Sequence, residues 1–277
     1  MPAQDNWPAL PYAAWKDTLE TLHLWTQIVG KIRLALTPWA NHSWHVTLHV
    51  STRGLVTPPM PLHGRDLSIE FDFIDQVLWL RTSDGDFRQL MLRPVSVAEF
   101  HADIMIALSE LGINLRINTM PSEIPNAIPF PDDLTHKSYD PEATQKFFRA
   151  LLRVHDVFAH FRTAFLGKVS PVHFFWGSFD LAVTRFSGRR APPHPGGVPG
   201  MPDSVARKPI RTRCPARGFG PAAARSIIPP SILTPIPRLT ALPRRACSPR
   251  RLFSPGNSAN SFCPTTRCAP RVSRNGR

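Results

Sequence analysis

The last part of this chain contains no acidic residue. All 20 Asp and Glu, all 11 His and all 7 Trp of the 277 residues precede residue 204. Residues 1–203 carry 18 Lys and Arg and a net charge of −2, whereas residues 204–277 carry the other 15 and a net charge of +15. A change of composition this large indicates a boundary. We therefore expect a single folded domain over 1–203 and a disordered basic tail over 204–277.

Cysteine is scarce and lies only in that tail. Its four positions have no spacing typical of a zinc site, and no histidine lies in the tail to complete one, so we expect neither a metal site nor a disulfide framework. Long apolar runs are also lacking, and the N-terminus has no signal-peptide pattern. We expect a soluble cytoplasmic protein that does not contact a membrane. The cysteines are Cys214, Cys247, Cys263 and Cys268.

The sequence before the tail switches between helical and strand-like periods. Apolar residues spaced three and four apart predict helices over about 11–36, 96–111 and 140–165, the second with Ser96 as its N-cap. Alternating residues predict strands, with Glu70 and Asp72 on an outward face. Short connections favour an α+β fold, in which an antiparallel or mixed sheet packs against helices. The expected strands cover 42–50, 67–73, 76–82, 87–94, 113–118, 172–176 and 180–186.

Three segments carry a family resemblance. They read "WPALPYAAWKDTLETLHLW", "MPSEIPNAIPF" and "SPVHFFWGSFDLAVTRFSGRR". In this order they resemble a bacterial family catalogued as domain of unknown function 5996, over about residues 7–207. The resemblance implies no activity and no cofactor, so the cofactor is unknown at this point.

The sequence after Arg207 departs from that family. When the codons of "KPIRTRCPARGFGPAAAR" are regrouped one base earlier, they permit "EAYSHEVSSAGFWPGGGP", which matches the continuation expected of the family. We therefore interpret the tail as an out-of-frame translation that leaves the domain incomplete at its C-terminal end, which resequencing the DNA across Val205–Arg213 would check. The alternative is a basic arm that binds nucleic acid nonspecifically through its 15 cations. Few aromatic residues are present there to stack on bases, so we expect no specific nucleic-acid partner.

The segment "SPVHFFWGSFDLAVTRFSGRR" is the densest cluster of reactive side chains. Alternation predicts a strand, a bend at Gly177 and a second strand. We expect His173 and Asp180 to form a proton-transfer pair in a pocket that binds a small molecule, with Trp176 as an apolar wall and Arg185 facing a carboxylate or phosphate. The alternative is a core strand with an Asp180–Arg185 ion pair. Ser178, Arg189 and Arg190 complete this candidate site.

A second candidate site lies on the first expected strands. In the expected strand over 42–50, His45 and His49 are four residues apart. This spacing separates them by about 13 Å along a strand, which is too far for both to bind one metal ion. His45 could instead pair across strands with Glu70 or Asp72 to form a ligand site. The alternative is a solvated sheet face.

No nucleophile elbow, phosphate loop or dinucleotide fingerprint occurs in the sequence. Two functions therefore remain open. One is an enzyme or ligand-binding protein for small molecules, which we favour because charged groups among aromatic residues are costly without a use. The other is a noncatalytic module that docks a protein partner through an aromatic surface.

Overall fold

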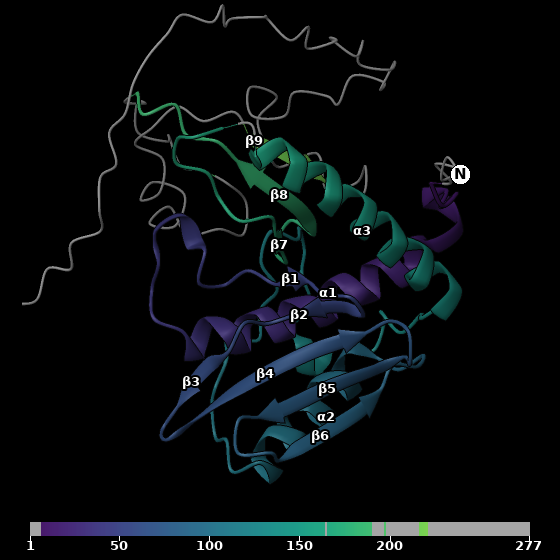
Figure 1. Cartoon of the computed structure of the whole chain (residues 1–277). Helices are drawn as coiled ribbons and strands as arrows, with labels where there is room; N and C mark the ends of the chain where they lie inside the picture. The colour runs from purple at the N-terminus through teal and green to yellow at the C-terminus, as the bar shows by residue number, and fades with distance from the viewer. Residues whose placement is uncertain (1–6, 164, 190–196, 198–215, 221–277) are drawn as a thin grey trace, which may run out of the picture. The chain divides into compact units, whose positions relative to one another are not determined.

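The computed structural model describes residues 7–163, 165–189, 197 and 216–220. The chain divides into two compact units, Met1–Pro235 and Ile236–Arg277, and every described residue lies in the first. These residues form antiparallel sheets packed against helices, which confirms the predicted α+β class (Figure 1). Among the described helices, none is long and apolar enough to cross a membrane.

The larger sheet has the strand order β1-β2-β4-β5-β6, and β3 pairs with the other part of β4. Alternation builds it as predicted: Leu67, Ile69 and Phe71 of β4 are fully buried, while Glu70 faces the other side. Gly85, with φ of 100°, forms the tight turn between β5 and β6. The strands are β1 (His49–Val50), β2 (Gly54–Val56), β3 (Met60–Leu62), β4 (Arg65–Asp72), β5 (Val77–Thr82) and β6 (Phe87–Met91).

The smaller sheet consists of β7 (His173–Phe175), β8 (Asp180–Thr184) and β9 (Ala216–Phe219), all antiparallel. One bridge joins it to the segment that precedes β1. The amide of Leu48 donates to the carbonyl of Phe174 at 2.9 Å, and the amide of Phe174 donates back at 2.7 Å. The bridge fixes the β7–β8 turn next to the first helix.

Three α-helices cover these sheets. They are α1 (Tyr12–Leu36), α2 (Val97–Glu110) and α3 (Pro141–Thr163), close to the predicted ranges. The hydroxyl of Ser96 accepts from the amide of Glu99 and caps α2 as predicted. Helices α1 and α2 lie behind the larger sheet in Figure 1, and α3 packs against β8.

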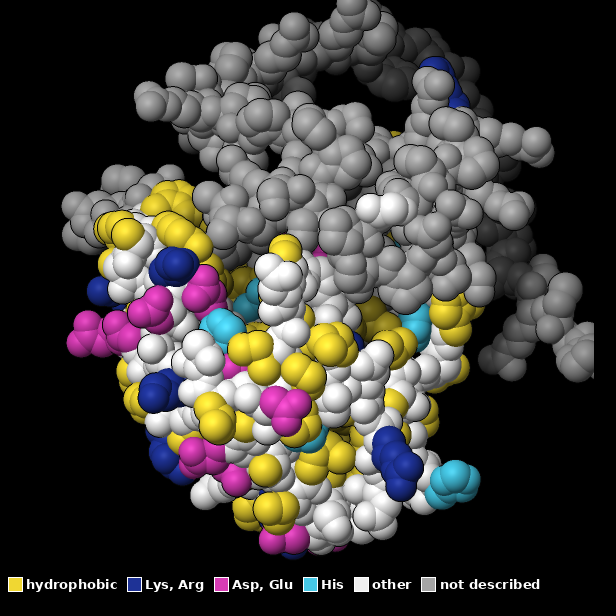
Figure 2. Space-filling view, turned by 180° about the vertical axis from the view of Figure 1, so that it is seen from behind, with side chains coloured by type: hydrophobic (Ala, Val, Ile, Leu, Met, Phe, Trp, Pro, Cys, Tyr) yellow, Lys and Arg dark blue, Asp and Glu magenta, His cyan; other side chains and the backbone are white. Residues whose placement is uncertain are grey.

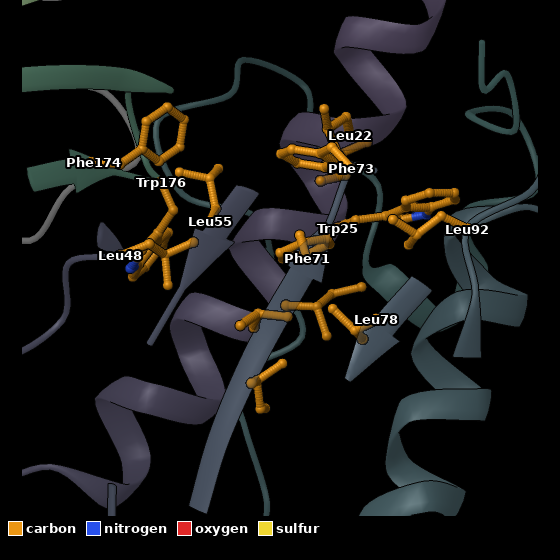
Figure 3. Packing of buried hydrophobic residues seen from close by; sticks show 14 of the residues in the cluster. Leu22, Trp25, Leu48, Leu55, Phe71, Phe73, Leu78, Leu92, Phe174 and Trp176 are labelled. Carbon is orange, nitrogen blue, oxygen red and sulfur yellow. The ribbon is translucent and has the colours of Figure 1, made fainter. Parts of the chain in front are cut away.

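The core fills the space between the helices and the larger sheet, as Figure 3 shows. Trp25 of α1 stacks on Phe100 of α2 with ring centroids 4.6 Å apart, and Phe71 of β4 lies next in the same stack. Fully burying each such side chain contributes about 1.5–3 kcal/mol. This core therefore fixes the orientation of α1, and with it the position of the side chains on the opposite face of the helix.

The expected strand over 42–50 is wrong in most of its length. Residues Asn41–Ser43 form a 3₁₀ turn, with His42 and Ser43 in the left-handed region, and only His49–Val50 pair as β1. Burial does not alternate either, because Thr47 and Leu48 are both buried. A segment with an alternating pattern forms a strand only where its backbone pairs with another strand. The left-handed residues His42 and Ser43 bend this segment, so that most of it does not pair.

The expected strand over 113–118 is also wrong. Burial does alternate there, with Ile113 buried and Leu115 and Ile117 packed partly against the core. However, this segment pairs with no strand in the described part of the chain. It leads into the proline-rich segment that continues to the 3₁₀ turn Phe130–Asp132.

Candidate functional site

A cavity of about 510 Å³ lies between α1, the segment 121–136 and the β7–β8 turn. Its walls are mostly apolar, and a few polar side chains converge on it. This combination is typical of small-molecule sites. The lining residues are Tyr12, Leu19, Glu20, His23, Leu24, Pro121, Glu123, Ile124, Pro125, Asn126, Ala127, Ile128, Asp133, His136, Gly177, Ser178 and Phe179.

Helix α1 contributes a polar stripe to this region, formed by His23, Gln27 and Lys31. The spacing of four places all three on one helix face. Nε2 of His23 lies 2.9 Å from the carbonyl of Gly177, and Lys31 Nζ donates to the hydroxyl of Ser122 at 3.2 Å. Burial lowers the pKa of His23 to about 4, so its ring is neutral and donates to that carbonyl. Burial also lowers the pKa of Lys31.

Gln27 binds the backbone of Ser122 in both directions. Its Nε2 donates to the Ser122 carbonyl at 2.9 Å, and its Oε1 accepts from the Ser122 amide at 2.7 Å. Gln27 is fully buried, so these bonds have no water to compete with them. The pair fixes the segment immediately before Glu123.

Glu123 presents its carboxyl group to the cavity. Its backbone has φ of 60°, in the left-handed region, and its carboxyl group lies directly against Gly177. A Cβ at Gly177 would lie 2.3 Å from Oε1 of Glu123, so only glycine permits this approach. Burial, and then the nearby charge of Asp180, raise the pKa of Glu123 to about 7.

Asp180 lies behind Glu123 at the start of β8. It is 8% exposed, accepts a hydrogen bond from the hydroxyl of Ser178 and packs against Gly220, the residue after β9. Burial raises its pKa to about 6. Among the described residues, neither of these two carboxyl groups forms an ion pair. Two carboxylates that interact with no cation nearby repel each other, so protonation of one of them is favoured.

A second acid and a histidine lie on the opposite wall. Nδ1 of His136 is 2.7 Å from Oδ2 of Asp133, and Oδ1 of Asp133 accepts from the amides of Thr135 and His136. Asp133 is 1% exposed, whereas the His136 side chain is 31% exposed. The carboxyl group therefore orients the imidazole of His136, a residue that lines the cavity.

The two residues predicted as a proton-transfer pair have different partners. His173 is buried, with Nδ1 3.2 Å from the Thr47 hydroxyl and its ring near His49. Burial, followed by the nearby His49 and Arg162, lowers the pKa of His173 to about 3. Asp180 pairs in register with Phe175, accepts a hydrogen bond from Ser178 and interacts electrostatically with Glu123. The structure thus places Asp180 beside the cavity and His173 in a separate cluster.

Trp176 also belongs to the core rather than to the cavity. It is 7% exposed, donates from Nε1 to the carbonyl of Val46 at 2.8 Å, and packs against Gly30 so closely that a Cβ there would overlap the indole. Lys31 lies 5.8 Å from the centre of its ring. Trp176 therefore supports the β7–β8 turn from behind, while Ser178 is the predicted residue that lines the cavity.

The predicted arginines lie elsewhere. The guanidinium of Arg185 lies 3.6 Å from the ring centre of Phe161, and in the described residues it forms no ion pair with Asp180. Arg189 is exposed, and its amide donates to the Ser187 hydroxyl. Arg190 lies outside the described residues.

The structure does not bring His45 to the acids of β4. Glu70 accepts from the Ser51 hydroxyl at 2.8 Å and from Arg81 at 3.1 Å. Asp72 was predicted to face outward but is 1% exposed, because Arg53 and the turn amides of Ile74 and Asp75 surround its carboxylate.

His45 is half-buried, and burial lowers its pKa. Within the described ranges, no three His, Cys, Asp or Glu side chains are arranged to hold a metal ion.

Four site residues were missed in the sequence: His23, Glu123, Asp133 and His136. A signal for the first was present, because His23, Gln27 and Lys31 interrupt an otherwise apolar helix face at regular spacing. For Glu123 no local signal exists, since its environment is created by Gly177, which is distant in the sequence.

The space-filling view of the side opposite to Figure 1 shows apolar, acidic and histidine side chains interspersed on the described surface (Figure 2). Where side chains are coloured in this view, Lys and Arg do not gather into a continuous stripe, as a nucleic-acid groove would require.

Comparison with known proteins gives one match. A family model described as "Family of unknown function (DUF5996)" matches residues 7–231. This match continues past Arg207, where the resemblance in the sequence was expected to end, and it includes β9. No curated protein and no solved structure matches the chain.

Proposed function

Because the chain belongs to DUF5996, a family of unknown function, we propose its function from the cavity: it binds a small organic molecule and transfers a proton through Glu123, coupled to Asp180. The observation that carries this proposal is the half-buried carboxyl group of Glu123 at the cavity wall, which lies against Gly177 and interacts electrostatically with the buried Asp180. We further propose that the protein is soluble and cytoplasmic, and that its partner is a small molecule rather than a nucleic acid or a membrane.

The protonation state of Glu123 supports this role. A group whose pKa is about 7 exists in both forms at neutral pH, so it can give up a proton as an acid or accept one as a base. Maintaining an acid in this state is costly for the fold, because a buried carboxyl group loses its hydration. Such groups are concentrated at functional sites.

The surroundings supply the other requirements of a proton-transfer site. Gln27 and Gly177 fix the position of Glu123, and the apolar walls reduce the access of water. The hydroxyl of Ser178 and the imidazole of His136 provide two further polar groups that line the cavity. Together they can orient one polar end of a bound molecule toward Glu123.

Filling the cavity tests the proposal. In the full chain, Ala127→Trp places an indole in the cavity, while Ala102→Trp, on the exposed face of α2, serves as the matched control. We expect benzyl alcohol and cyclohexanol to shift NMR signals of Ser178 and other lining residues in the parent and in Ala102→Trp. Ala127→Trp should abolish these shifts while the protein remains folded. Equal shifts in both variants, or none at the cavity in the parent, would refute the proposal.

One observation favours a second function, that of a noncatalytic interaction module. On the outer face of the larger sheet, Phe87 and Met91 are 54% and 56% exposed, and Trp79 lies beside Phe87 under the guanidinium of Arg81. A shallow hollow of about 340 Å³ lies among these residues. Exposed aromatic residues on a sheet face are typical of protein-docking surfaces. A protein partner that binds there, with the cavity inert, would support this alternative.

A further inference from the structure

We propose that the ligand of the cavity is a compact organic amine, whose ammonium group faces Glu123 and whose apolar body fills the remaining space. This inference rests on the proposed function and names the chemical class of its ligand. It is drawn from the charges that line the cavity, the partners of those charges and the character of the walls.

Carboxyl groups outnumber basic side chains among the described lining residues, where the basic ones are His23 and His136. Glu20, Glu123 and Asp133 contribute carboxyl groups, and neither Lys nor Arg is present. Asp180 adds a fourth acid directly behind Glu123. An anionic ligand would therefore meet charges of its own sign, whereas a cationic ligand would be attracted.

The acids differ in how well they are neutralised. Glu20 has Lys16 at 3.7 Å, and Asp133 has the imidazole of His136 and two backbone amides. Glu123 has no such cation in the described part of the chain, although it is the acid in contact with the β7–β8 turn. The position opposite its carboxyl group is therefore where a positive charge from a ligand would be most favourable.

Basic residues near this part of the fold have other contacts. Lys31 donates to the Ser122 hydroxyl and faces the Trp176 ring, and it forms no ion pair with Glu123 among the described residues. The neutral ring of His23 donates to the carbonyl of Gly177. Arg185, which the sequence suggested for binding a carboxylate or phosphate, stacks on Phe161 and Phe165.

The walls define the rest of the ligand. Leu19, Leu24, Ile124, Ile128 and Phe179 are apolar, so most of a ligand's surface would leave water for hydrocarbon contact. A volume of about 510 Å³ falls in the range of small organic ligands. The aromatic ring of Tyr12 at the lining offers a further favourable surface to a cation.

An ammonium group would also change the protonation of Glu123. A cation close to a carboxyl group favours its charged form, so binding at neutral pH should release protons into the buffer. A neutral ligand of the same shape would leave this equilibrium nearly unchanged. Proton release is therefore a signature of the proposed contact that does not depend on knowing a reaction.

Three probes of matched shape test the inference on the full chain: 2-phenylethylamine, 2-phenylethanol and phenylacetate. Protein NMR locates each binding site and gives its dissociation constant, and calorimetry in two buffers of different ionisation enthalpy counts the protons. We expect the amine to bind at least about tenfold more tightly than the other two and to be the probe that releases protons. The variant Glu123→Gln should reduce the preference to less than about threefold, and Glu142→Gln, an exposed acid outside the lining, should retain it.

The outcomes separate the two proposals. If the alcohol shifts the cavity signals and the amine binds no better, the ligand class is wrong while the small-molecule site stands. If the amine is preferred equally in Glu123→Gln, Glu123 is not its counter-ion and the inference fails. If none of the three probes shifts a cavity signal, the proposed function itself fails.

Discussion

The carboxyl group of Glu123 lies against a glycine rather than against a cation. Gly177 permits this contact only because it lacks a Cβ, and Asp180 makes the charged form of Glu123 still less favourable. Burial, and then the charge of Asp180, raise the pKa of Glu123 to about 7. At the scale of the residue, the close approach of Glu123 to the turn thus depends on the absence of a side chain at Gly177.

The variant Glu123→Gln should change how stability depends on pH. The pKa of Glu123 is raised from 4.5 to about 7 on folding, so its contribution to stability is fully present below pH 4.5 and is lost as the pH rises through 7. Gln does not titrate. We therefore expect the variant to gain on the order of 2 kcal/mol relative to the parent between pH 5 and pH 8, less than the full shift because the carboxyl group is partly solvated. Urea unfolding of both proteins at pH 5 and at pH 8 measures this change in the free energy of unfolding.

Other groups also make stability depend on pH. Asp180, with a pKa near 6, loses stabilisation as the pH rises, whereas His23 and His173, with lowered pKa values, lose it as the pH falls below 6.5. Both proteins share the contributions of the two histidines, which cancel in the difference, whereas Asp180 interacts with Glu123, so the difference reports these two carboxyl groups together. A difference that does not change with pH would contradict the raised pKa of Glu123.

Helix α1 acts on the site through the segment that it binds. The Gln27 side chain donates to the Ser122 carbonyl and accepts from the Ser122 amide, as the backbone of a neighbouring strand would do. This contact is the only hydrogen bonding from α1 to Ser122 apart from Lys31 in the described residues. The position of α1 therefore determines the position of the backbone at Ser122, immediately before Glu123.

Replacing Gln27 with Met removes these hydrogen bonds at nearly constant volume. We expect a loss of roughly 2 kcal/mol of stability, because a buried donor and acceptor are left unpaired. The Ser122 amide should exchange with solvent at least about tenfold faster, and the pKa of Glu123 should move back toward its ordinary value. Gln89→Met, on the exposed face of β6, is the matched control. Unchanged protection of the Ser122 amide in Gln27→Met would show that the segment is fixed by other contacts.

The sequence predicted those elements whose signals are local. The Ser96 cap and the alternation of β4 each lie within a few residues, and both are present. The strand over 113–118 failed because alternation reports burial and not pairing. Of the residues in the predicted site, Ser178 lines the cavity and Asp180 lies two residues further along the chain, whereas the position of Glu123 depends on packing that no local pattern encodes.

At the largest scale, the described residues combine two sheets that are joined by the Leu48–Phe174 bridge, and β9 pairs with β8. β9 lies within the stretch 204–277 that we proposed to be an out-of-frame tail. The permitted in-frame reading contains the same Gly-Phe pair at Gly218 and Phe219, the residues paired with Ala182 and Leu181. A frame change at Lys208 would therefore keep these two residues of β9, and the family match itself extends to residue 231.

Shortening the chain tests the contribution of β9. A chain that ends at Arg207 leaves one edge of β8 without its partner strand and removes Gly220 from Asp180. We expect it to melt at least about 5 °C lower than the full chain and to bind a hydrophobic dye. A chain that ends at Gly220 should melt like the full chain. Equal melting of all three proteins would mean that β9 adds no stability.

The contact between His23 and Gly177 spans 154 residues of sequence, so the cavity closes only after the β7–β8 turn has left the ribosome and met the first helix. Until then Glu123 and Asp180 are ordinary carboxylates in water. Closing the cavity raises the pKa of both, and at neutral pH the chain must therefore take up hydrogen ions as its last wall is put in place. Folding of this protein is in this respect itself an acid–base reaction with the solvent.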